Sequence, residues 1–145
     1  MKHTLTILLL ALALPTWAQK QYQLKSPDGK LVAAVSLGDQ MNYLITHESD
    51  TILKPSPLAM ALENGPVWGR GSHLSSAKTH AVNQQINALF YKRNQITDQY
   101  NELVLQFKEN FSLIFRAYNE GIAYRFVSNS NQGIVVKNEE ASFNF

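Results

Sequence analysis

Cysteine is absent from the 145 residues, which excludes disulfides, a thiolate nucleophile and a zinc site built on cysteine. An excess of one charge is also lacking, because 13 Lys and Arg against 11 Asp and Glu leave a formal net charge of +2. So small a net charge predicts no binding to nucleic acid or to an acidic membrane surface. The fold must therefore be held together by an apolar core alone.

Long hydrophobic runs are lacking beyond the amino terminus. There, residues 4–14 form an apolar run that Pro15 ends, and Thr16 and Ala18 provide small side chains for cleavage before Gln19. The run is too short to span a bilayer. A buried amino-terminal helix is the alternative, but the order of polar start, apolar run and cleavage site favours a signal peptide over residues 1–18. We therefore expect a protein exported to the periplasm of a Gram-negative bacterium, with no membrane anchor and with residues 19–145 as its mature domain.

Helical periodicity is lacking in the mature chain, where apolar residues instead recur at every second position, as in strands. Residues 26–29 (Ser-Pro-Asp-Gly), 38–40 and 48–50 are turn signals. They separate the segments 21–25, 31–37, 41–47 and 51–53, which we predict to form an antiparallel meander. The fold class is accordingly all-β.

Two regions do not follow this pattern. Pro55 and Pro57 predict an extended corner, because neither can donate a hydrogen bond to a sheet, and a strand at 58–62 and a loop at 65–72 should follow it. Residues 75–97 are polar and have few apolar points. We expect one short strand near residues 89–92, with mobile loop around it.

The strongest pattern is the pair of alternating runs in residues 113–127, which predicts a β-hairpin. Its turn, residues 119–121, should form a three-residue loop with a bulge, closed by Gly121 in the left-handed conformation. Arg116 and Arg125 are interleaved with the apolar positions. The simpler interpretation is a solvated or salt-bridged sheet face, and the alternative is that one arginine orders a neighbouring loop or domain.

The last residues predict two further strands, one at 134–137 and one in which Ala141, Phe143 and Phe145 alternate with polar residues. An apolar strand at the end of a chain leaves an unpaired sheet edge, which favours aggregation unless another strand pairs with it. We therefore expect more chain downstream, so that residues 19–145 form an incomplete domain. The alternative is a terminal strand that pairs fully within this domain.

No phosphate loop, dinucleotide fingerprint, zinc-protease helix or Gly-x-Ser-x-Gly elbow is present. The mature histidines, His47, His73 and His80, share no metal-ligand spacing and are interpreted as separate surface residues. Glu139 and Glu140 are adjacent, so in a strand they point to opposite faces and cannot act jointly on one bond. One of them facing a cleft, as an acid or a metal ligand, is the alternative.

Other candidate residues have simpler explanations. Asp28, Asp39 and Asp50 all lie at predicted turns. Trp68 could stack on a sugar ring as a substrate-binding residue, but we prefer the interpretation that it anchors its glycine-rich loop on the core.

Several stretches together resemble the amino-terminal domain of glycoside hydrolase family 97. They are residues 26–29, 55–58, 100–103 and, the most specific, 115–126 (FRAYNEGIAYRF). Glu120 stands where the family usually has Asp, and residues 75–97 fit poorly. Members are secreted α-glucosidases and α-galactosidases of Bacteroides-like bacteria.

The resemblance implies part of an antiparallel β-supersandwich of the galactose-mutarotase type. In complete members a catalytic (β/α)₈ barrel follows, and it carries the catalytic carboxylates. Calcium is the cofactor of the complete enzymes, and its ligands lie in the barrel and beyond the position of Phe145. The resemblance therefore assigns no catalytic and no metal-binding residue to this sequence.

The resulting hypothesis is the amino-terminal part of a secreted, calcium-dependent, exo-acting glycosidase for terminal α-glucosides or α-galactosides. This part should be inactive alone, since the carbohydrate substrate is bound through the missing barrel. One alternative is a non-catalytic carbohydrate-binding module in which Trp68 and the tyrosines stack on sugar rings. The other is a β-sandwich interaction protein of the cell envelope.

Overall fold

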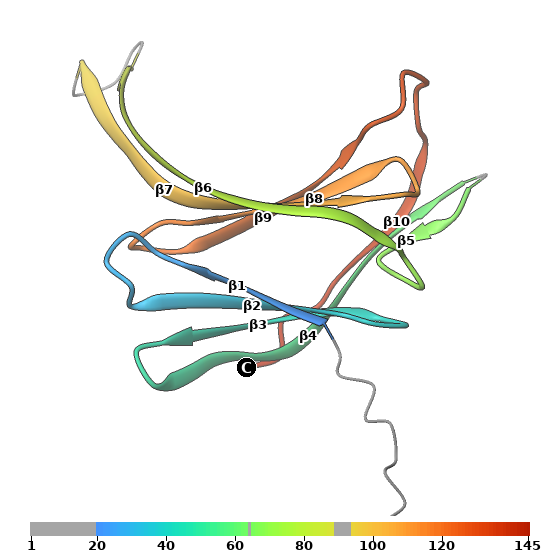
Figure 1. The fold of residues 1–145 in the computed structure, drawn as a ribbon, viewed down its shortest axis with the longest axis horizontal. Coiled ribbons are helices and arrows are strands. Elements are labelled where there is room, and N and C mark those ends of the chain that lie inside the picture. Colours follow the sequence, from blue (N-terminus) through green and yellow to red (C-terminus); the bar gives the residue numbers. More distant parts are fainter. Residues whose placement is uncertain (1–19, 64, 89–93) are drawn as a thin grey trace, which may run out of the picture.

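Two antiparallel sheets face each other in the computed structural model, which describes residues 20–63, 65–88 and 94–145 (Figure 1). The predicted signal peptide and the short strand expected at 89–92 lie outside the described residues. The described residues form ten strands and no helix, which confirms the all-β class. They accordingly contain no helix that is long and apolar enough to cross a membrane.

The first sheet contains the predicted meander and has the order β1-β2-β3-β4-β10, with β5 paired to β4. Its strands are β1 (Lys20–Lys25), β2 (Leu31–Leu37), β3 (Met41–His47), β4 (Asp50–Leu62), β5 (Val67–Trp68) and β10 (Val136–Ala141). The turn before β2 forms as expected, with Gly29 at a φ of 76°. The short strand β5 lies inside the segment that we expected to be loop.

The second sheet has the order β6-β7-β8-β9. Its strands are β6 (Leu74–Asn87), β7 (Gln95–Phe107), β8 (Phe111–Ala117) and β9 (Ile122–Ser128). The predicted hairpin is the β8–β9 pair, which is in register from Phe111 opposite Ser128 to Ala117 opposite Ile122. That prediction is confirmed.

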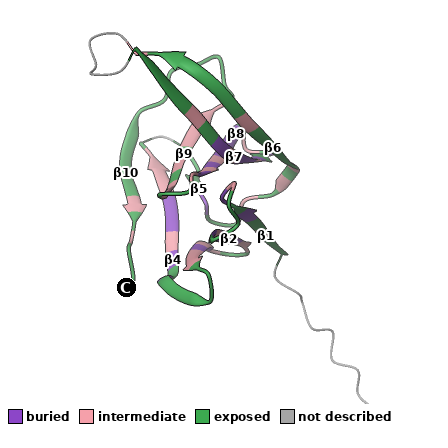
Figure 2. Ribbon diagram, turned by 90° about the vertical axis from the view of Figure 1, so that its left-hand side faces the viewer, coloured by how far each residue is buried: buried purple, intermediate pink, exposed green. Residues whose placement is uncertain are grey.

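The core lies between the two sheets, where β8 buries one complete side. Phe111, Leu113 and Phe115 have no exposed surface. Trp68 of the first sheet stacks on Phe111 at 4.8 Å between ring centroids, and Phe107 stacks on Phe111 at 4.5 Å. Figure 2 shows buried positions on β2, β4, β7 and β8, while most of β6 and β10 is exposed. The three stacked rings thus join the two sheets.

The corner predicted at Pro55 and Pro57 is wrong, because β4 continues through both prolines. The ladder with β3 is irregular there. Tyr43 lies opposite Ser56 and Ile45 opposite Leu53, so β4 has one residue more than β3 between these pairs. Such a bulge tolerates a residue without an N–H, which explains how a proline fits inside this strand.

The mobile loop expected at residues 75–97 is also wrong, because β6 and β7 form one long hairpin there. Polar side chains pair across it: Gln84 donates to Asp98 at 3.0 Å, and Gln85 donates to Thr97 at 2.9 Å. Both faces of this part of the hairpin are largely exposed. Because neither face of such a hairpin is buried, its apolar residues need not alternate. The sequence therefore lacks the pattern from which a strand is predicted.

The turn of the β8–β9 hairpin differs from the prediction. Its loop has four residues, from Tyr118 to Gly121, and the Tyr118 N–H donates to the Gly121 carbonyl at 2.8 Å. Gly121 is not among the residues with positive φ, and the pairing shows no bulge. The left-handed residue belongs to the three-residue loop with a bulge, and the chain forms a four-residue loop instead, which explains the difference.

The carboxyl-terminal strand begins and ends differently from the two strands predicted. β10 runs from Val136 to Ala141 and pairs with β4. Beyond it, Asn144 still bonds to β4, because its carbonyl accepts from the Lys54 N–H and its N–H donates to Ser56 Oγ. Phe145 is 79% exposed.

Gly69 is a position where a side chain should be strongly destabilising. Its φ is +91°, and an added Cβ would lie 2.4 Å from the Leu58 carbonyl oxygen. We expect Gly69→Ala to lower the free energy of unfolding by about 3 kcal/mol or more, through left-handed strain and backbone overlap together. Urea denaturation of the purified chain measures this change.

Gly71 is the matched control, since its φ of +56° also requires left-handed backbone but nothing lies within 4 Å of an added Cβ. Gly71→Ala should cost only about 1–2 kcal/mol. Equal losses in the two variants would contradict the role of the Leu58 contact.

Candidate functional site

The outward face of the second sheet carries a row of polar residues that strand pairing places side by side. His80 of β6 lies opposite Glu102 of β7, Glu102 lies opposite Arg116 of β8, and Arg116 lies opposite Ala123 of β9. Because Leu103 and Phe115 point into the core, their neighbours Glu102 and Arg116 must point outward. The alternation that builds the core therefore also builds this row.

Glu102 is the centre of the row. The Glu102 side chain is only 9% exposed, and its Oε2 accepts a hydrogen bond from Arg116 Nε at 2.6 Å. Its other oxygen lies 3.2 Å from His80 Nε2. The Arg116 guanidinium also lies 4.4 Å from the centre of the Tyr100 ring, a cation–π contact. The position of Arg116 is thus held from two sides.

The ionisation of this group follows from its contacts. The hydrogen bond from Arg116 to Glu102 raises the pKa of Arg116 above its usual range. Burial raises the pKa of Tyr100. Arg116 and the phenol of Tyr100 therefore both keep their protons at neutral pH.

A hollow of about 190 Å³ lies next to the row, on the outward face of β8 and β9. Its lining consists of Ile114, Arg116, Tyr118, Ala123, Tyr124 and Arg125. The Arg125 side chain is exposed, and within residues 20–63, 65–88 and 94–145 it takes part in no ion pair. The salt-bridged interpretation is confirmed for Arg116, and Arg125 is the solvated arginine of the two.

Trp68 is buried, with 3% of its surface exposed. Its ring stacks on Phe111 and contacts Phe126 at 6.4 Å between centroids. The structure therefore supports the core-anchor interpretation, and the ring offers no open face on which a sugar could stack.

The histidines lie on the surface, as predicted, but two of them pair with carboxylates. His73 Nδ1 lies 2.9 Å from Glu109 Oε1, and His80 pairs with Glu102. His47 ends β3 and is exposed. The turn interpretation of Asp28 agrees with its contacts, because the Ser26 hydroxyl donates to its carboxylate and lowers the pKa of Asp28.

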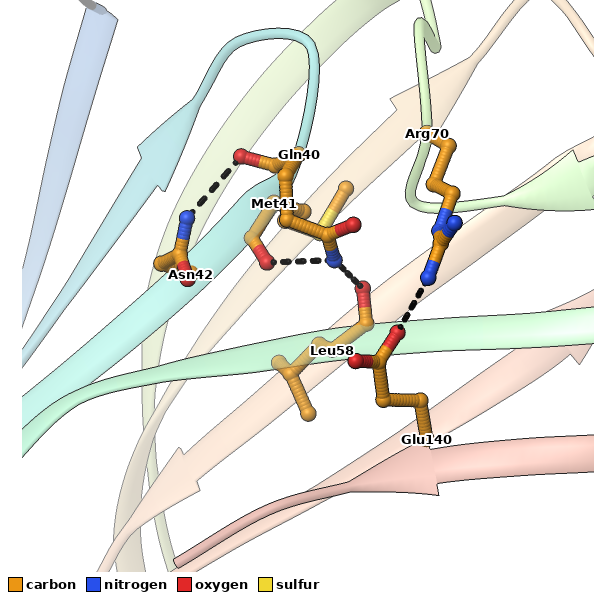
Figure 3. A network of polar contacts seen from close by, with 6 residues as sticks. All are labelled: Gln40, Met41, Asn42, Leu58, Arg70 and Glu140. Carbon is orange, nitrogen blue, oxygen red and sulfur yellow. Dashed lines mark hydrogen bonds and ion pairs between the residues drawn. The ribbon is translucent and has the colours of Figure 1, made fainter. Parts of the chain in front are cut away.

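Glu139 and Glu140 point to opposite faces of β10, as the sequence predicted. Glu140 accepts from Arg70 at 2.9 Å (Figure 3). Gln40, drawn in the same figure, donates to the Leu58 carbonyl; the distance is 3.2 Å. No group of three or more metal-ligating side chains occurs in the part of the chain that the structure describes.

Glu139 lies near Tyr124, whose pKa is raised to about 12 mainly by burial, with the Glu139 carboxylate adding to the effect. Tyr124 packs against Tyr43 at 5.7 Å between ring centroids. The Tyr43 hydroxyl is buried and has no hydrogen-bond partner among the described residues. These phenols are core residues with a polar end rather than a catalytic pair.

Residues 24–145 match the family model described as glycosyl-hydrolase 97 N-terminal. The chain is 40% identical over 144 residues to a retaining alpha-galactosidase of Bacteroides thetaiotaomicron. That alignment covers 99% of this chain and 22% of the relative, so the chain spans about a fifth of the relative's length.

Solved structures show the same fold. A glycoside hydrolase family 97 enzyme from Pseudoalteromonas sp. strain K8, in complex with panose, superposes with a TM-score of 0.72 at 20% identity. That match covers 82% of this chain and 20% of the other. A beta-arabinopyranosidase superposes with a TM-score of 0.76 at 24% identity, over 86% of this chain and 21% of the other.

Glu102→Gln tests how far the carboxylate stabilises the outward face. The substitution removes a buried charge that Arg116 and His80 both contact, so the free energy of unfolding should fall by about 2 kcal/mol. The partly exposed position of Arg116 keeps the loss below that of a fully buried pair. Glu120→Gln, at the exposed hairpin loop, is the control and should change stability by less than about 0.5 kcal/mol in urea denaturation.

Because of Tyr124, the free energy of unfolding should change with pH in the alkaline range. In the folded chain its pKa is about 12, whereas an unfolded tyrosine loses its proton near pH 10. Between these values the folded state binds more protons, so the free energy of unfolding falls as the pH rises. Tyr124→Phe removes this titration, and its urea midpoint should fall less from about pH 9 to about pH 11.5 than that of the unmodified chain. Equal falls would contradict this account.

Proposed function

The chain belongs to the glycosyl-hydrolase 97 N-terminal family, and from this membership we propose that it is the amino-terminal part of an exo-acting glycoside hydrolase. The substrates of the whole enzyme are terminal α-galactosides or α-glucosides. One observation carries the proposal: the 40% identity to a retaining alpha-galactosidase extends over 99% of this chain. Identity spread over the whole domain supports a shared role in the enzyme as well as a shared fold.

The chain supplies a rigid sandwich rather than the reacting groups. Hydrolysis of a glycoside requires two carboxyl groups placed on either side of the scissile bond. In this domain Glu102 is held by Arg116, and Glu140 is held by Arg70. We therefore assign the catalytic carboxylates, and the binding of the carbohydrate, to the part of the enzyme that corresponds to the remaining length of the relative.

Two further properties belong to the proposal. The signal-peptide pattern in residues 1–18 supports export to the periplasm. Calcium would be the cofactor of the whole enzyme, held by residues outside this chain. The buried position of Trp68 weakens the alternative of a carbohydrate-binding module, since the proposed stacking platform is part of the core.

Hydrolysis assays of the purified chain test the first consequence. With calcium and 4-nitrophenyl α-galactoside or α-glucoside, the chain should release no nitrophenol above a heat-denatured control. Turnover above that control would show that the chain carries its own catalytic groups.

A chimera tests the positive part of the proposal. The chain replaces the matching segment of the Bacteroides thetaiotaomicron relative, and the fusion should hydrolyse 4-nitrophenyl α-galactoside. The relative without its amino-terminal segment is the control. A soluble chimera that is no more active than this truncated control would count against the proposed role.

A further inference from the structure

The hollow on the outward face of β8 and β9 has the composition of an anion-binding site. Arg116 and Arg125 line it, and the Tyr118 side chain adds a phenol. A guanidinium group offers a planar set of N–H donors that matches an oxyanion with two oxygens. Neither arginine is needed by the core, because both point away from it.

Arg116 is already fixed in position before any ligand arrives. Its Nε is bonded to Glu102 at 2.6 Å, and its guanidinium lies 4.4 Å from the centre of the Tyr100 ring. Glu102 accepts from the Nε–H of this guanidinium, and a hydrogen bond to Tyr118 also raises the pKa of Arg116, so the bound anion shares the guanidinium with both side chains. A donor that is held in place loses little conformational entropy when it binds, which raises affinity.

Arg125 supplies the second donor group. It lies on the neighbouring strand, directly opposite Ile114, and its side chain is exposed. Ile114 and Ala123 line the hollow between the arginines with apolar surface. An occupant should therefore carry a short apolar stem as well as an anionic head.

The balance of charge indicates which anion fits. The Glu102 carboxylate offsets the charge of Arg116, so Arg125 leaves the hollow with about one net positive charge when His80 is neutral. A singly charged carboxylate matches this balance better than a phosphate group, which carries nearly two charges. The volume of about 190 Å³ is below the range of about 300–1,000 Å³ typical of drug-sized ligand sites.

We propose that this hollow is a binding site for a carboxylate group, held between the guanidinium groups of Arg116 and Arg125. The carboxylate belongs either to an acidic protein side chain or to a sugar acid, since both place a carboxylate on a short carbon frame. The site is independent of the proposed function, because it rests on the residues of this domain alone.

Titration of the chain with sodium acetate tests the site. The arginine Nε–H signals of Arg116 and Arg125 are followed by ¹H–¹⁵N NMR at constant ionic strength and neutral pH. We expect both signals to shift saturably. Arg125→Gln, an exposed substitution, should weaken binding at least about tenfold, because one charge-assisted donor group is lost.

Two matched variants separate geometry from charge. Arg125→Lys keeps the charge but loses the planar fork, and its affinity should fall between those of the unmodified chain and Arg125→Gln. Lys108→Gln removes one positive charge from an exposed position in the turn before β8, and it should bind acetate within about twofold of the unmodified chain. A non-saturable shift, or equal weakening by Arg125→Gln and Lys108→Gln, would overturn the proposal.

Three further probes identify the source of the carboxylate. A blocked Gly-Glu-Gly peptide represents a protein side chain, and D-galacturonate represents a sugar acid, with D-galactose as its uncharged control. Binding of either acid in competition with acetate supports the site, and the tighter of the two names the source. Inorganic phosphate that binds more tightly than all carboxylates would overturn the assignment to a carboxylate.

Discussion

The burial of one side of β8 between the two sheets is the contact on which the rest of the structure depends. With neither cysteine in the chain nor a helix among the described residues, sheet-on-sheet packing is the main source of stability. Phe111, Leu113 and Phe115 are fully buried, and each such side chain contributes about 1.5–3 kcal/mol relative to an exposed one. The stack of Phe107, Phe111 and Trp68 then joins β7, β8 and β5.

The same packing decides what the outward face presents. Side chains alternate along a strand, so once Phe115 points inward, Arg116 must point outward. The register of β7 then brings Glu102 opposite Arg116, and the register of β6 brings His80 opposite Glu102. If β8 slipped by one residue, Arg116 would point into the core and Phe115 would point outward. The stability gained by burying Phe115 prevents this slip. The polar row and the hollow beside it are in this sense a consequence of the core.

The parts of the fold that could be predicted are those with one buried and one exposed face. The meander of β1 to β4 and the β8–β9 hairpin have clear alternation, and both were expected. The far half of the β6–β7 hairpin was not, because its pairs, such as Gln84 with Asp98, are polar on a ribbon that is largely exposed. The corner predicted at the prolines of β4 is wrong for another reason. A bulge, which depends on the partner strand, makes room for Pro55, and Pro57 lies opposite Asn42 in the ladder. Of the candidate site, the outward position of Arg116 followed from alternation, but its partners did not.

The sequence by itself determined which side chains share a face, because alternation is a property of the extended backbone within one strand. The sequence also contains the family resemblance, which is most specific in residues 115–126. It contains none of the catalytic motifs that were sought. Only the tertiary structure decided which residues meet: Glu102 with Arg116 and His80, Arg125 across from Ile114, and Trp68 on Phe111. These contacts join residues of different strands or of different sheets. They depend on register and on how the sheets pack, which are long-range effects that no local pattern encodes.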